Sequence, residues 1–69
     1  MIMKLDRIKL ITEMARKRMT VVEMAKITGV SRVTITNVRS GKSCSAAVGY
    51  AIAKALNKDP ADLIETTED

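Results

Sequence analysis

The sequence predicts a small all-α domain, a compact bundle of five short helices. The chain has only 69 residues, of which 46% are hydrophobic. Tyr50 is the single aromatic residue, so the core must consist of aliphatic side chains and Met, which suits closely packed helices. Apolar residues recur at helical spacing, with no repeat and no Gly/Ser-rich linker. We expect one domain over residues 1–69, with its core at 5–65 and a frayed tail at 66–69.

The first helix is expected over about residues 4–18. Apolar residues fall on one broad face of this segment, and basic residues occupy the opposite face. The apolar set is Ile8, Leu10, Ile11, Met14 and Ala15. We expect Met14, like Met24, Ile27 and Ile52 in later helices, to serve only in packing.

The second helix is predicted from the signals at its two ends. Thr20, with Glu23 three residues later, is a capping-box signature that places the helix start near Val21. Gly29 adopts a positive φ at little cost, so the helix is expected to end near Thr28.

The remaining three helices are delimited in the same way. Ser31 is expected to cap a third helix over 32–39, which Gly41 ends. Ser45 is expected to cap a fourth helix that runs to residue 56, with Asn57 in the left-handed exit. The Asp-Pro pair at 59–60 starts a short fifth helix over about 60–65. The inward residues of these last two helices are Val48, Ala51, Ile52, Ala55, Leu56, Leu63 and Ile64.

Basic residues gather in the first part of the chain. Residues 1–43 hold ten basic and three acidic side chains, a net charge of +7. Residues 44–69 hold two basic and five acidic side chains, a net charge of −3, which gives +4 for the whole chain. A polyanion is therefore expected to dock on the basic part.

Several function classes find no support in the sequence. No apolar run approaches the roughly 20 residues that span a bilayer, and no secretory segment is present at the start, so we expect a cytoplasmic protein without membrane contact. Because the chain has a single cysteine, Cys44, and no His, we expect no metal centre, and we expect no cofactor and no small-molecule ligand. The lack of His and of a nucleophile beside a base argues against an enzyme. Cys44 is expected to be a buried loop residue rather than a redox switch.

Residues 21–40 have the pattern of two helices that cross at a sharp turn. A small residue at the crossing, Ala25, lets two helices approach at 90–120°, and Gly29 permits the turn between them. Ile35 and Val38 are expected to hold the third helix against the second. The outward face of the third helix then carries Arg32, Val33, Thr36 and Asn37.

At these residues the sequence resembles the phage repressor and Cro-type helix-turn-helix family, often called the XRE family. The resemblance covers about residues 8–64. Five segments arrive in family order and nearly at family spacing: M-T-V-V-E-M-A (19–25), G-V-S-R-V-T-I (29–35), G-K (41–42), I-A-K-A-L (52–56) and D-P-A-D-L-I (59–64). The resemblance implies a lambda-repressor-like bundle whose helix-turn-helix is formed by helices 2 and 3, with the third helix in the major groove of DNA.

The resemblance also implies which residues meet DNA. Arg32, Val33 and Asn37 match the base-reading positions of the family, and Thr36 is a further candidate. Arginine pairs with guanine O6 and N7, asparagine with adenine, and valine can contact a thymine methyl group. The residues carried over as phosphate contacts, or added as candidates beside them, are Thr20, Val21, Ser31, Thr34, Ser40, Lys42 and Arg18.

Three positions depart from the expected pattern. Val21 stands where the family often has glutamine, whose amide bridges phosphate and the third helix, so this anchor is lost. Arg18 stands where glycine is common, and a left-handed conformation there would cost about 1 kcal/mol. Arg32 opposes the dipole of the third helix at its first turn, which suggests that it serves an external anion.

Two functions compete on this evidence. The first is a sequence-specific transcriptional regulator, a small Cro-like repressor of phage or prophage type that binds a palindromic operator as a homodimer. The second is a protein-interaction module of the same fold, such as an antitoxin-like or antirepressor-binding partner with little DNA affinity, favoured by the valines at 21, 22 and 33. The role of Tyr50 is left open between a phosphate contact, a dimer contact and simple partial exposure.

Overall fold

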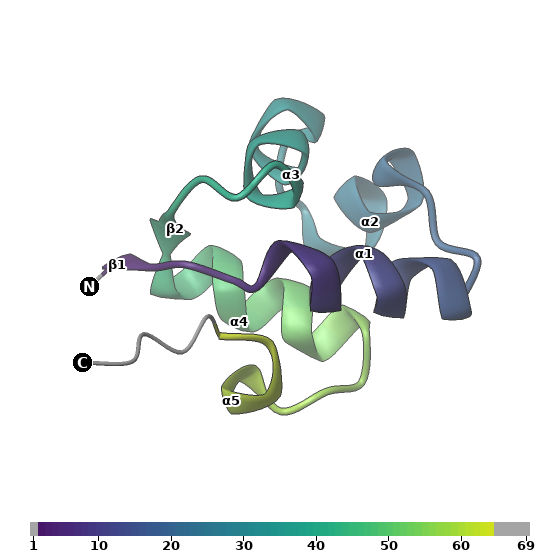
Figure 1. Cartoon of the computed structure of the whole chain (residues 1–69). Coiled ribbons are helices and arrows are strands. Elements are labelled where there is room, and N and C mark those ends of the chain that lie inside the picture. The colour runs from purple at the N-terminus through teal and green to yellow at the C-terminus, as the bar shows by residue number, and fades with distance from the viewer. Residues whose placement is uncertain (1, 65–69) are drawn as a thin grey trace.

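A computed structural model describes residues 2–64, which form five helices and two very short strands (Figure 1). The helices pack around one another, with α4 in the middle of the view. Among the described residues, no helix has the length and hydropathy needed to cross a bilayer. The elements in chain order are β1 (Ile2–Met3), α1 (Arg7–Arg16), α2 (Val21–Thr28), α3 (Arg32–Arg39), β2 (Cys44–Ser45), α4 (Ala46–Ala55) and α5 (Pro60–Leu63).

The predicted caps of α2 are confirmed. The Thr20 hydroxyl accepts a hydrogen bond from the Glu23 backbone N–H at 3.1 Å, and the Glu23 carboxylate accepts one from the Thr20 N–H at 3.1 Å. At the other end, Gly29 has φ +75° and donates its N–H to the Ala25 carbonyl at 2.9 Å. Both ends of α2 are thus fixed by local signals, as expected from the sequence.

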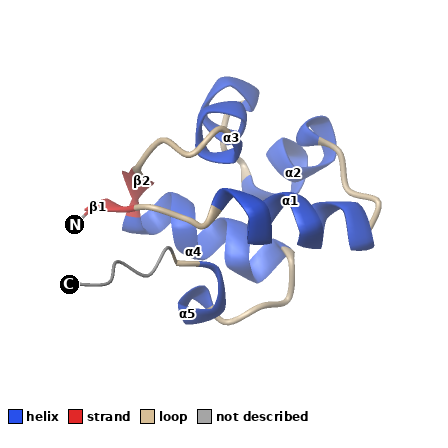
Figure 2. Ribbon diagram, in the orientation of Figure 1, coloured by secondary structure: helices blue, strands red, loops and turns tan. Residues whose placement is uncertain are grey.

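The predicted start of the first helix is wrong by three residues. Asp6 caps α1, because its side chain accepts hydrogen bonds from the N–H groups of Ile8 and Lys9 at 2.9 and 3.1 Å. The residues before it are extended, and β1 pairs antiparallel with β2 in a two-stranded ladder (Figure 2). Neither strand was predicted from the sequence. The left-handed conformations of Arg18 (φ +51°) and Asn57 (φ +56°) were anticipated.

The C-terminal part of the described chain folds back onto the N-terminal segment. Ile64 forms a β-bridge with Leu5, and the Asp6 N–H donates to the Leu63 carbonyl at 2.7 Å. The fifth helix therefore ends at Leu63, shorter than the predicted 60–65. The predicted frayed tail at 66–69 lies outside the described residues.

The core is aliphatic, as predicted, but three residues assigned to it are exposed. Ile8 and Ile27 are each 61% exposed, because Ile8 lies beside a groove between α1 and α5 and Ile27 lies over a shallow hollow lined by alanines of α4. Ala15 is exposed as well. The buried side chains are Met3, Leu5, Leu10, Met14, Met24, Ile35, Val38, Cys44, Ile52, Ala53, Leu56 and Leu63.

The stripe predicted for α4 is confirmed at Ile52 and Leu56, which are fully buried, but the rest of the buried face consists of small residues that were not predicted. Ala53 and Gly49 are buried, whereas Ala51 and Ala55 are only half-buried. Gly49 has no Cβ where the thioether of Met3 lies, and a Cβ added there would overlap the Met3 Sδ atom. This close approach brings β1 onto the start of α4.

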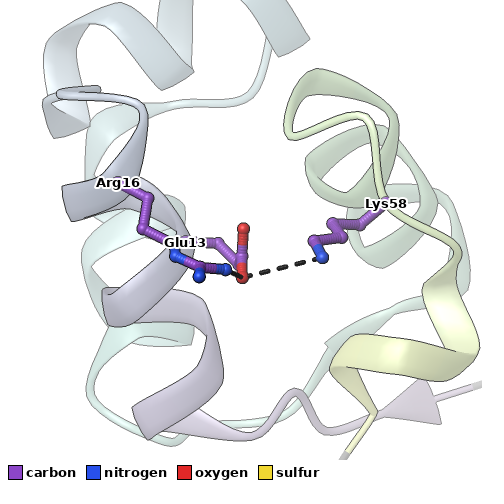
Figure 3. Close-up of polar contacts among 3 residues, drawn as sticks. All are labelled: Glu13, Arg16 and Lys58. Atoms are coloured by element: carbon purple, nitrogen blue, oxygen red, sulfur yellow. Dashed lines mark hydrogen bonds and ion pairs between the residues drawn. The ribbon is translucent and has the colours of Figure 1, made fainter.

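An ion pair joins α1 to the turn between α4 and α5 (Figure 3). The Glu13 carboxylate lies 3.2 Å from the Arg16 guanidinium and 3.7 Å from the Lys58 ammonium. Glu13 is half-buried, but both cations are at least one-third exposed, and ion pairs at the surface are worth only about 0 to 1 kcal/mol, so we assign the stability of the fold to the apolar core rather than to this cluster.

Candidate nucleic-acid interface

A three-residue turn at 29–31 sets the position of α3 relative to α2. The Thr28 hydroxyl donates to the Met24 carbonyl at 2.7 Å and accepts the Val30 N–H at 3.1 Å, so it holds the chain as it leaves α2. Gly29 supplies the left-handed residue that the turn requires. The Ser31 hydroxyl then accepts the Thr34 N–H at 3.2 Å and starts α3. The turn is therefore built from short local contacts.

The packing of α3 determines which of its side chains face outward. Ile35 and Val38 are each about 1% exposed and anchor the helix on the core. Helical geometry then directs the residues on the opposite side toward solvent. Arg32, Val33 and Thr36 are exposed, and Asn37 is half-buried. In Figure 1, α3 stands at the edge of the molecule beside α2, away from α5.

An open cleft lies between α2 and the outward face of α3. We call it the α2–α3 cleft, and it is lined by Val21, Val22, Arg32, Val33, Thr36 and Asn37. All four residues predicted from the sequence to read bases therefore line one surface. The lining contains one cation and no carboxylate, which suits an anionic ligand rather than a cationic one.

Val22 is a residue that the sequence analysis did not place in the DNA-reading set. It lies one position after the start of α2 and is 44% exposed. The sequence feature that could have indicated Val22 is the presence of apolar residues at 21, 22 and 33 in an otherwise basic region. Their meeting in one cleft follows only from the crossing of the two helices.

The predicted phosphate contacts divide into two chemical groups. Arg18 and Lys42 are exposed cations at the ends of α1 and α3. The hydroxyls of the second group already form hydrogen bonds within the protein. The Ser40 hydroxyl donates to the Thr36 and Asn37 carbonyls at 3.0 and 2.9 Å. The hydroxyls of Thr20, Ser31 and Thr34 take part in the caps of α2 and α3. Val21 offers only its position in the first turn of α2.

No group of three or more metal-ligating side chains occurs among residues 2–64. In the same part of the chain, Cys44 is buried, and burial raises the pKa of its thiol above the ordinary value. The predicted base-reading residues thus converge on the α2–α3 cleft, and neither a metal site nor Cys44 is part of it.

A comparison with protein families identifies this architecture. A family model described as the Cro/C1-type HTH DNA-binding domain matches residues 9–69, and the chain belongs to that family. Membership makes the chain a DNA-binding protein and confirms the resemblance seen in the sequence. No curated protein and no solved structure shows a significant match to the chain.

Proposed function

We propose that this protein is a transcriptional repressor that binds a palindromic operator as a homodimer. In this proposal α2 and α3 form the helix-turn-helix of a single domain, and α3 enters the major groove. The observation that carries the proposal is the α2–α3 cleft, where Arg32, Val33, Thr36 and Asn37 lie together on an outward face. Family membership supports double-stranded DNA as the partner.

Each side chain of this face has a distinct role in the proposal. Arg32 donates two hydrogen bonds to guanine O6 and N7, Asn37 pairs with the N6 and N7 atoms of adenine, and Val33 contacts a thymine methyl group. Thr36 lies beside them and supplies a hydroxyl to a neighbouring base edge. These contacts give sequence preference, because the major groove presents a distinct pattern for each base pair.

The remaining residues hold the DNA backbone. Arg18 and Lys42 bring positive charge to phosphates on either side of the groove. The first turn of α2, from Thr20 to Val21, presents backbone N–H groups to a phosphate, as helix N-termini do. Ser31, Thr34 and Ser40 approach the backbone near the ends of α3 with hydroxyls that also cap the helix.

The proposed dimer is supported by the small surface that one α3 helix can cover. Two copies related by a two-fold axis read two half-sites about 34 Å apart, one turn of the duplex. The described body measures 36 × 23 × 19 Å, so each copy spans about one turn and presents α3 once. Repression would then result from occupation of the promoter.

Selection of bound sequences from a random duplex pool tests this proposal. We expect a palindromic consensus with two half-sites, bound by two chains. Arg32→Ala and Asn37→Ala should each weaken consensus binding by about 1–3 kcal/mol and relax the preference at one base pair, with little change on random DNA. An asymmetric site bound by one chain would contradict the dimer. Equal losses on consensus and random DNA would contradict the base-reading roles.

A protein-interaction module is the second candidate, and the exposed valines favour it. Val33 is 71% exposed, and exposed apolar side chains on a helix often mark a protein contact. A salt titration on random duplex separates the two functions, because phosphate neutralisation makes log K fall steeply with log salt. Lack of binding at about 50 mM salt would exclude the repressor and leave the protein partner.

A further inference from the structure

Half of the residues that line the α2–α3 cleft are valines, and they come from both helices. Val21 and Val22 lie in the first turn of α2, and Val33 lies in the first turn of α3. Val21 is half-buried and packs against the core, whereas Val22 and Val33 are 44% and 71% exposed. The cleft therefore has an apolar wall that the fold itself does not cover.

The rest of the cleft lining is polar. Arg32, Thr36 and Asn37 surround the valines with hydrogen-bonding groups and one positive charge. A flat apolar protein surface placed here would bury Arg32 without a counter-charge, which is unfavourable. The cleft instead fits a ligand that is mainly polar and anionic and that carries a small apolar group.

Duplex DNA offers such a ligand in the major groove. The C5-methyl group of thymine is the apolar group that the four standard base pairs present there, and 5-methylcytosine carries the same group. Phosphates on either side supply the negative charge. The size of one methyl group suits a contact made by the ends of two valine side chains.

We propose that Val22 and Val33, backed by Val21, form a subsite for the C5-methyl group of one pyrimidine in each half-site. The proposal rests on the proposed function, since α3 must enter the major groove. It goes further in making α2 part of base discrimination, through Val22, the residue that follows the position where the amide anchor is missing. The preference for thymine at that position then comes from the methyl group rather than from hydrogen bonds.

Replacement of thymine by deoxyuridine tests the subsite, because it removes only the methyl group. Each thymine of the selected operator is replaced in turn, and Kd is measured by fluorescence anisotropy. We expect one position per half-site at which uracil weakens binding about fourfold, the value for one buried CH2 group. Val22→Ala and Val33→Ala should bring the thymine-to-uracil ratio at that position toward one.

A matched control uses an exposed aliphatic residue away from the cleft. Ile27 is 61% exposed near the end of α2, and Ile27→Ala should keep the fourfold ratio. Because uracil alters DNA flexibility equally for every variant, only a ratio that depends on Val22 or Val33 reports direct contact. Circular dichroism confirms that each variant is folded.

Two results would overturn the subsite while the repressor proposal stands. One is an operator whose affinity is unchanged by uracil at every thymine position. The other is a fourfold uracil effect that persists in both valine variants, which would assign the effect to DNA shape. If the random pool yields no bound sequence, the proposed function fails, and the subsite fails with it.

Discussion

Single residues show where local sequence signals sufficed and where they did not. Arg32 and Asn37 were placed on the outward face because the caps of α3 fix its start, and helical periodicity then fixes the rest. Val22 was missed because its place in the cleft depends on how α2 crosses α3. Ile8 and Ile27 were wrongly assigned to the core, since periodicity identifies an apolar face but not which part of it another helix covers.

Cys44 illustrates a residue whose chemistry is set by its burial. It is 9% exposed in β2, where it pairs with Met3, and burial raises the pKa of its thiol above the ordinary 9.0. Thiolate is the reactive form, so burial makes this thiol less reactive in the folded protein than in the unfolded chain. The structure thus agrees with a buried packing residue.

We expect Cys44 to react with iodoacetamide on the order of tenfold more slowly in the folded protein than in urea at the same pH. Because the pKa of the Cys44 thiol is higher in the folded state, this thiol loses its proton at a lower pH in the unfolded chain. The thiol's contribution to stability is therefore complete below pH 9.0 and declines above it. Urea titrations of wild type and Cys44→Ala should show a stability difference that narrows as the pH rises above 9.0. Equal alkylation rates in both states would contradict the burial of this thiol.

At the level of elements, the helices were predicted well because residues close together in the sequence determine where each helix begins and ends. Four N-caps, at Thr20, Ser31, Ser45 and Asp59, stand where the sequence placed them. The fifth, Asp6, was overlooked, which is why α1 was predicted to start too early. The two strands escaped prediction for another reason. Each is two residues long and is stabilised only by its distant partner, so no local pattern marks it.

The capping box of α2 gives a prediction at this scale. Thr20→Ala removes the acceptor of the Glu23 N–H and should lower the free energy of unfolding by about 1 kcal/mol. Urea denaturation followed by circular dichroism measures the loss. Thr12→Ala is the matched control, because Thr12 is exposed within α1 and caps no helix. The free energy of unfolding of this variant should equal that of the wild type or exceed it slightly. Equal losses in both variants would show that the hydrogen bond at Thr20 is not the cause.

For the whole molecule, the uneven charge found in the sequence coincides with the arrangement of the helices. The segment with net charge +7 contains α1, α2 and α3, whereas the described residues 44–64, which contain α4 and α5, hold two basic and two acidic side chains and have a net charge of zero. The helices of the proposed DNA face therefore belong to the basic part of the chain. The sequence predicted the order and number of the helices but not the closure of the fold, since the bridge from Leu5 to Ile64 joins residues far apart in the chain.

Removal of one of the proposed phosphate-binding cations tests this charge arrangement. Lys42→Ala should weaken binding to consensus and random duplex alike and make the slope of log K against log salt less steep by about 0.9, the value for one phosphate. Lys54 on α4 is the matched control, because Lys54→Ala makes the same change in charge beside the hollow at the end of α2. We expect its slope to match wild type. Equal effects of the two variants would assign the salt dependence to net charge alone.

The missing Cβ at Gly49 also constrains the evolutionary history of this sequence. Position 49 has no side chain where the Met3 thioether lies, so a larger residue at 49 requires the side chain at position 3 to move or to be shorter. A lineage that has gained a larger residue at 49 and a shorter one at 3 cannot easily restore methionine. Among homologues we therefore expect glycine at 49 to accompany a long side chain at 3. This covariation would join the first strand to the fourth helix across most of the chain.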